Sequence, residues 1–215
     1  MDKKELQNPA LYTNRELSWL LFNKRVLSEA RDKQLLLFER LKFLSITASN
    51  LDEFFMVRIG SLVDMIHAEY TKKDIAGMSA KEQLDALMEE THKFAALQYS
   101  TYNRMLLPQL RANGLNFVEH HEQLTERQAQ YVDEYFEENV YPVLTPMAVD
   151  SSRPFPLIRN KTLNIGALVA KKGEKDTEIE FATVQVPSVL PRVVRIPAAK
   201  EGDTEVAVLL LEEII

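Results

Sequence analysis

The chain has 215 residues, of which 46% are hydrophobic and 27% are charged, with no cysteine and a formal net charge of −6. This composition excludes a disordered chain and is typical of a globular protein that is large enough to bury a core. The absence of cysteine excludes disulfides, thiolate zinc sites and a cysteine nucleophile. The acidic balance argues against general nucleic-acid binding, so any site for a polyanion would need basic groups that are concentrated locally.

The N-terminus and the apolar runs indicate a cytoplasmic protein with no transmembrane segment. Met1 to Glu5 are mostly charged and lead into no apolar stretch, so no secretory signal is visible. The longest apolar runs, such as Val206 to Leu211, are far too short to span a bilayer. These features are also compatible with peripheral association with a membrane.

Residues 1–113 are expected to form a helical bundle. Thr13 and Glu16 have the spacing of a capping box, and apolar residues then recur on one helix face: Leu17, Leu20, Leu21, Leu27 and Ala30. A second helix should begin near Leu35. A third should begin after Ser49-Asn50, because Glu53 again follows three residues later, and its apolar face is Leu51, Phe54, Phe55, Leu62 and Ile66.

Ser79 and Glu82 have capping-box spacing at the start of a longer, fourth helix. Pro108 should bend or interrupt this helix, and Gly114 suits the left-handed position that follows a helix end. Four helices with short connections predict an antiparallel arrangement.

Residues 114–215 are expected to form an α+β domain. A short extended segment at Leu115 to Val118 precedes a helix capped by Thr125 and Gln128, and prolines 142, 146, 154 and 156 then exclude a long helix. Segments rich in Val, Ile and Thr follow, separated by polar turns, and we interpret them as strands: residues 162–170, 179–186, 192–196 and 205–211. The apolar C-terminal residues suggest that this domain is truncated, because a natural domain seldom ends on a run that needs covering.

The residues by themselves do not predict a complete active site. The glycines are too sparse for a nucleotide-binding loop: Gly60, Gly77, Gly114, Gly166, Gly173 and Gly202. His120, His121 and Glu122 are adjacent, so their side chains point apart and are poor ligands for a single metal. His67 and His92 lie in predicted helices and suit surface or packing positions. We therefore expect neither catalytic nor metal-binding residues in this chain.

Three long segments nevertheless resemble the polyphosphate kinases that work through a phosphohistidine. NRELSWLLFNKRVLSEA at Asn14 to Ala30, with FERLKFLSITASNLDEFFMVRIGSL at Phe38 to Leu62, is similar to the helical N-terminal domain of that family. YPVLTPMAVDSSRPFPLIRNKTLN at Tyr141 to Asn164 and FATVQVPSVLPRVVRIP at Phe181 to Pro197 are similar to its next domain, in the same order. The family often has Pro-Ser-His where this chain has Ser151-Ser152-Arg153, so the resemblance assigns no role to that turn.

The resemblance implies a function for the full-length protein. The family reversibly transfers the terminal phosphate of ATP to inorganic polyphosphate with magnesium, through a histidine in C-terminal domains that this chain lacks. The resemblance places the adenine-contacting asparagine at Asn50, since it directly precedes the LDEF motif. It also implies a homo-oligomer, partly built by the second domain, and Mg²⁺ ligands outside this chain.

Several residues have structural alternatives. Asn50 sits where a helix cap is expected, and Asp52 and Glu53 would then favour the helix start. Trp19 and Phe22 suit either a binding surface or the core, and Arg58 could face a phosphate or pair with a carboxylate. Arg153, Arg159 and Lys161 suit a polyphosphate contact or a solvated loop.

Three hypotheses follow for the chain. In the first, it is part of a polyphosphate kinase, supplies adenine contacts and assembly surface, and is inactive alone. In the second, it is a non-enzymatic protein-binding module with an apolar interface at Leu209 to Ile215. In the third, it is a small phosphotransferase that uses His120 or His121.

Overall fold

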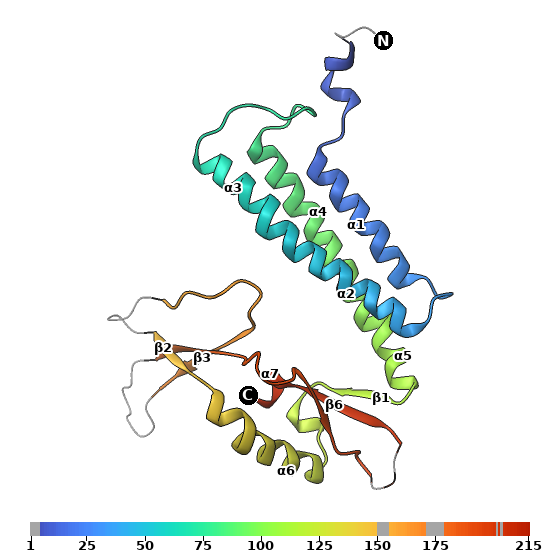
Figure 1. The fold of residues 1–215 in the computed structure, drawn as a ribbon, viewed down its shortest axis with the longest axis vertical. Helices are drawn as coiled ribbons and strands as arrows, with labels where there is room; N and C mark the ends of the chain where they lie inside the picture. Colours follow the sequence, from blue (N-terminus) through green and yellow to red (C-terminus); the bar gives the residue numbers. More distant parts are fainter. Residues whose placement is uncertain (1–4, 150–154, 171–178, 201, 203) are drawn as a thin grey trace. The chain divides into compact units, whose positions relative to one another are not determined.

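The computed structural model describes residues 5–149, 155–170, 179–200, 202 and 204–215. The chain divides into two compact units, Met1–Leu110 and Arg111–Ile215 (Figure 1). The boundary expected between residues 113 and 114 lies within a few residues of this division. The first unit is helical and the second contains the strands, so the predicted fold class is confirmed.

The helical unit consists of three long antiparallel helices rather than the four that we expected (Figure 1). Two short 3-10 turns precede the first long helix, and two of the long helices each contain a π-helical segment. The elements are η1 (Glu5–Gln7), η2 (Pro9–Leu11), α1 (Arg15–Arg31), α2 (Leu37–Phe54), η3 (Phe55–Ile59), α3 (Gly60–His67), α4 (Ala80–Thr101), η4 (Tyr102–Leu106) and α5 (Leu107–Ala112).

The helix start predicted after Ser49-Asn50 is wrong. Asn50 lies inside α2, which continues through η3 into α3 because the residues at both junctions keep right-handed helical backbone angles. The π-helical segment η4 similarly precedes Pro108, where the predicted interruption falls, and such segments accommodate a local disturbance without ending a helix.

The other cap predictions have mixed outcomes. Asn14, not Thr13, caps α1, because its side-chain oxygen accepts from the backbone N–H groups of Glu16 and Leu17. The capping box of Ser79 and Glu82 is confirmed. Gly114 has a φ of 80°, the left-handed conformation expected of it after a helix.

The core of the helical unit confirms most of the predicted apolar faces. Leu20, Phe54 and Leu62, which we placed on these faces, are at most 5% exposed. Two residues that we placed on the buried faces are instead exposed: Leu21 by 55% and Phe55 by 38%.

In the described residues of the second unit, the strands form two three-stranded sheets. Its elements are β1 (Leu115–Val118), η5 (His121–Gln123), α6 (Glu126–Tyr135), η6 (Phe136–Val140), η7 (Tyr141–Val143), β2 (Met147–Val149), β3 (Asn164–Val169), β4 (Glu180–Gln185), β5 (Val193–Ile196), β6 (Val206–Leu210) and α7 (Leu211–Ile214). The first sheet has the strand order β1-β6-β5, in which β1 is parallel to β6 and β5 is antiparallel to β6. The second sheet has the order β2-β4-β3 and is antiparallel throughout.

The β1-β6-β5 sheet and α6 share an aliphatic core. Val132 of α6 packs in the same cluster as Val194 of β5 and Leu209 of β6. The capping box of Thr125 and Gln128 at the start of α6 is confirmed.

The apolar C-terminal residues belong to this core. Leu209 and Leu211 are 0% exposed and Ile214 is 8% exposed. The exposed interface patch that our second hypothesis placed at Leu209 to Ile215 is therefore wrong, because the sheet and α6 already cover these side chains.

Candidate functional site on the helical unit

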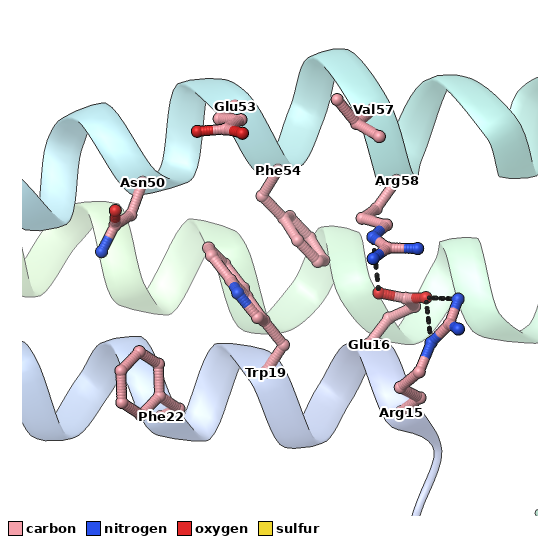
Figure 2. Close-up of a pocket in the computed structure, with 9 residues that line it drawn as sticks. All are labelled: Arg15, Glu16, Trp19, Phe22, Asn50, Glu53, Phe54, Val57 and Arg58. Carbon is pink, nitrogen blue, oxygen red and sulfur yellow. Dashed lines mark hydrogen bonds and ion pairs between the residues drawn. The ribbon is translucent and has the colours of Figure 1, made fainter.

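A pocket of about 390 Å³ lies between α1 and the continuous helix α2–η3. Its volume is within the range of about 300–1,000 Å³ that is usual for small-molecule sites. Nine residues line it, as Figure 2 shows: Arg15, Glu16, Trp19, Phe22, Asn50, Glu53, Phe54, Val57 and Arg58. The pocket has an aromatic and amide end, with Asn50, Trp19 and Phe22, and a charged end, with Arg15, Glu16 and Arg58 (Figure 2).

Asn50 is held in the pocket by a buried asparagine on the facing helix. Its Nδ2 donates to Oδ1 of Asn23 at 3.1 Å, and Nδ2 of Asn23 donates to the backbone carbonyl of Thr47 at 3.1 Å. Asn23 is 0% exposed, so the acceptor of this hydrogen bond lies in the interior of the helical unit. Within the described residues the Asn50 amide makes this single hydrogen bond, which leaves one N–H and the carbonyl oxygen for a ligand.

An aromatic wall lies beside Asn50. The rings of Trp19 and Phe54 are stacked, with centroids 4.4 Å apart and planes at 5°. Phe54 is buried, Trp19 is half-buried and Phe22 is 48% exposed. The structure thus places Trp19 in the core and in the pocket wall at once, whereas Phe22 belongs to the pocket surface only.

At the charged end, one buried carboxylate lies between two guanidinium groups. Nε and Nη2 of Arg15 donate to Oε1 of Glu16 at 3.0 and 2.7 Å, and Nε of Arg58 lies 3.9 Å from Oε2 of the same residue. Glu16 is 7% exposed, whereas the Arg58 side chain is 49% exposed. Of the two alternatives that the sequence left for Arg58, the contact with a carboxylate is present, and the side chain also lines the pocket.

The acidic residues after Asn50 do not act at a helix start, because α2 continues through them. Glu53 instead lines the pocket and is exposed. Across the described parts of the chain, no three His, Cys, Asp or Glu side chains are grouped so that they could hold a metal ion.

The adjacent histidines of the second unit face different carboxylates. Nδ1 of His120 lies 3.9 Å from Glu213, and Nε2 of His121 lies 3.7 Å from Asp133. The expectation that these side chains point apart thus agrees with their contacts.

Two of the three residues in the predicted basic group, Arg153, Arg159 and Lys161, line one pocket. Arg159 and Lys161 line a pocket of about 480 Å³ in the second unit, with Arg192. Arg192 is paired with Glu212, its Nη2 lying 2.6 Å from Oε1. Arg153 lies outside the described residues.

Sequence reasoning missed Arg15, Glu16 and Val57 as members of the pocket. A signal was available, because Arg15, Trp19 and Phe22 are separated by four and three residues and so share one helix face. Asn50 and Val57 are seven residues apart, so they share one helix face if the helix continues through Asn50. Because we predicted that a helix begins after Asn50, we did not recognise this shared face.

Comparisons with known proteins follow the two units. Residues 12–118 match the family model described as polyphosphate kinase N-terminal domain, and residues 127–215 match the polyphosphate kinase middle domain. The polyphosphate kinase of Lactiplantibacillus plantarum is 51% identical over 204 residues, which are 95% of this chain and 27% of that protein. That of Halalkalibacterium halodurans is 45% identical over 212 residues, 98% of this chain and 29% of that protein.

A solved structure has the same fold. The crystal structure of polyphosphate kinase from Porphyromonas gingivalis matches with a TM-score of 0.81 and 31% identity, over 94% of this chain and 29% of that chain. The chain therefore spans less than a third of the length of these relatives. No helix in the described ranges is both long and apolar enough to cross a membrane.

Proposed function

Since this chain belongs to the polyphosphate kinase family, we propose that the full-length protein reversibly transfers the terminal phosphate of ATP to inorganic polyphosphate. This chain contributes part of the nucleotide site. The reaction proceeds through a phosphohistidine and magnesium supplied by other parts of the protein. Within the described residues no three His, Cys, Asp or Glu side chains are grouped, and no step is assigned to the metal in this chain.

The observation that carries the proposal is the combination of groups around Asn50. A purine presents donors and acceptors along one edge, and an amide can donate to and accept from that edge together. The remaining N–H and the carbonyl oxygen of Asn50 provide this pair beside an aromatic wall. Adenine at this end of the pocket would direct its sugar and phosphates toward Arg15 and Arg58.

Asn23 acts as a positioning residue in this proposal. It is fully buried and accepts the hydrogen bond from Nδ2 of Asn50, so it selects one orientation of the amide. A fixed amide loses less side-chain entropy on binding a ligand than a mobile one does.

The chain alone is proposed to bind nucleotide weakly and to transfer no phosphate. The pocket is open to solvent at Phe22, Val57 and Arg15, so these two helices cover little of a ligand's surface. Tight small-molecule sites enclose most of the ligand, which here requires further protein surface.

The second unit is proposed to contribute to a homo-oligomer of the full-length protein. Several large apolar side chains on it are strongly exposed, among them Leu157 at 95%, Val189 at 77% and Leu168 at 75%. Contiguous apolar patches mark association surfaces, and the proposal takes these side chains as parts of such a patch. Sedimentation velocity on the full-length protein checks this, and a monomer at micromolar concentration would contradict it.

The test is ATP-dependent polyphosphate synthesis by the full-length protein, with the wild type beside Asn50→Ala. We expect the wild type to make polymer and this 215-residue chain to make none. Loss of the amide should raise the KM for ATP roughly three- to tenfold, the effect of losing one or two neutral hydrogen bonds. It should also cost about 1–3 kcal/mol of stability, because Oδ1 of the fully buried Asn23 loses its donor, so the KM is measured at a temperature at which both proteins are folded.

Asn103→Ala is the matched control, because Asn103 is exposed on η4 of the same unit and does not line the pocket. Its KM should equal that of the wild type. A full-length protein that makes no polymer would overturn the proposed activity, and an unchanged KM in Asn50→Ala would move the adenine contact elsewhere.

A further inference from the structure

A second pocket adjoins the charged end of the first. It has a volume of about 400 Å³ and shares Arg15, Glu16 and Arg58 with the pocket that contains Asn50. Figure 2 shows these three side chains together at one end of the first pocket. The second pocket extends from them toward the connection between α3 and α4, which carries Lys72 and Lys73.

The second pocket concentrates positive charge in a chain that is acidic as a whole. Arg15, Arg58, Lys72 and Lys73 line it, whereas the lining carboxylates are those of Glu16 and Asp74 only. The formal charge of its lining is therefore positive, although that of the chain is −6. This is the local concentration of basic groups that an acidic chain needs in order to bind a polyanion.

Both carboxylates are occupied by neighbouring groups. Glu16 accepts two hydrogen bonds from Arg15. Asp74 accepts from Nδ2 of Asn14 at 2.7 Å and from the backbone N–H of Met78 at 2.7 Å. These acids thus have structural roles, and the cations that remain exposed determine what the pocket attracts.

The connection that carries the lysines is anchored on both sides. Asp74 ties it to Asn14 at the start of α1, and Gln83 of α4 donates through Nε2 to the carbonyl of Met78 at 3.3 Å. Asn14 also donates to Oε1 of Gln83 at 2.8 Å, and both residues are at most 9% exposed. Lys72 and Lys73 therefore project from a buried hydrogen-bonded base rather than from an unattached loop.

At the junction, Arg58 keeps its donors for a ligand, whereas Arg15 already donates two hydrogen bonds to Glu16. Lys73 lies 3.9 Å from Oε2 of Glu82, and both side chains of this pair are exposed to solvent. Within the described residues, Arg58 makes no hydrogen bond and contacts Glu16 only as an ion pair at 3.9 Å. Guanidinium groups bind phosphate oxygens through two parallel N–H donors, and lysines bind them as point charges. Two arginines and two lysines around one pocket suit a ligand that carries several negative charges.

We propose that this second pocket, the basic subsite, binds a linear phosphoanhydride chain. The inference rests on the proposed function, because a nucleotide with its base at Asn50 would direct its phosphates to the junction at Arg15 and Arg58. The chain in the subsite has two sources with the same chemistry: the triphosphate of that nucleotide, or the end of a separate inorganic polyphosphate.

The test is equilibrium binding to the full-length protein that carries both Lys72→Gln and Lys73→Gln. Both lysines are exposed, so their replacement should leave the fold intact. The matched control carries Lys33→Gln and Lys42→Gln, which change the net charge equally at exposed positions of the same unit that line neither pocket. The probes are inorganic polyphosphate and ATP, each titrated at several salt concentrations.

If polyphosphate is the source, its affinity should fall about tenfold in the pocket variant, and the slope of log affinity against log salt should become shallower by about one to two. If the triphosphate is the source, the same changes should appear for ATP while polyphosphate binding stays constant. The control should show neither change.

Unchanged affinities and salt slopes for both probes in the pocket variant would overturn the subsite, as would equal losses in the control. The proposed function fails separately, if the wild-type enzyme makes no polymer. Because binding is measured without turnover, failure of the subsite can be distinguished from failure of the proposed function.

Discussion

In the helical unit, buried polar side chains join helices that are far apart in the sequence. Asn14 bonds to Gln83, Asn23 to Asn50, and Nε2 of Gln98 donates to Oγ1 of Thr47 at 3.0 Å. In the sheet unit, strands are joined by backbone hydrogen bonds, and most of the buried core is aliphatic.

This difference explains why the candidate site lies on the helices. Side-chain hydrogen bonds between helices specify which residues face each other, and they orient polar groups such as Asn50. Backbone pairing in a sheet specifies strand register instead, and it is indifferent to the outward side chains. A ligand pocket that needs oriented amides and guanidinium groups is therefore easier to build on the helical unit.

The largest expected effect comes from the aliphatic core of the sheet unit. Leu209→Ala should lower the free energy of unfolding of this unit by about 3 kcal/mol, because Leu209 is 0% exposed on the central strand β6. Hydrogen exchange of the β6 amides measures this free energy. The matched control is Leu168→Ala: Leu168 is 75% exposed, so its replacement should change the free energy of unfolding by less than about 0.5 kcal/mol.

Trp19, the only tryptophan of the chain, reports on the helical unit in the same sample. Its fluorescence transition in denaturant should be unchanged by Leu209→Ala. An equal shift at Trp19 would mean that the two units unfold together, and the comparison between them would lose its basis.

A smaller effect is expected from the polar network of the helical unit. Asn14→Ala should cost about 2 kcal/mol, because it removes the cap of α1 and leaves buried Gln83 without this hydrogen bond. Ser79→Ala, which removes only a cap, should cost about 1 kcal/mol. Urea denaturation followed by Trp19 fluorescence compares the two, and equal costs would show that the Asn14–Gln83 contact adds nothing.

The smallest effect concerns an ion pair on the surface of the helical unit. The hydrogen bond from Lys24 on α1, with a second from Lys93, lowers the pKa of Glu90 on α4 to about 2 from an ordinary value of 4.5. Because the folded pKa is the lower one, the stabilisation is complete above pH 4.5 and is lost as the pH falls toward 2.

Lys24→Gln should therefore raise the pKa of Glu90 toward 4.5, so that the stabilisation from this ion pair is lost at a higher pH. NMR titration of the Glu90 side-chain carbon measures the pKa directly. Lys81→Gln, which breaks only a pair with Asp85 within α4, is the control and should leave Glu90 unchanged.

The sequence by itself determined the local structure wherever one signal acted without competition. The capping boxes at Ser79 and Thr125 and the runs rich in Val and Ile each predicted an element that the structure contains. The three-residue strand β2 was missed, because the prolines on both sides dominate the local pattern. The resemblance to polyphosphate kinases, also a property of the sequence, identified the family.

Only the tertiary structure decided what happens at Asn50. Its neighbours carry the same signal as a true helix start, and an isolated chain could satisfy the asparagine side chain at its own backbone. In the fold, α2 continues through Asn50, and Asn23 on another helix accepts a hydrogen bond from its side chain beside a pocket. The parallel pairing of β1 with β6 was equally inaccessible from local patterns. In both cases the partner lies far along the chain, and contacts between distant residues form only when the whole unit packs.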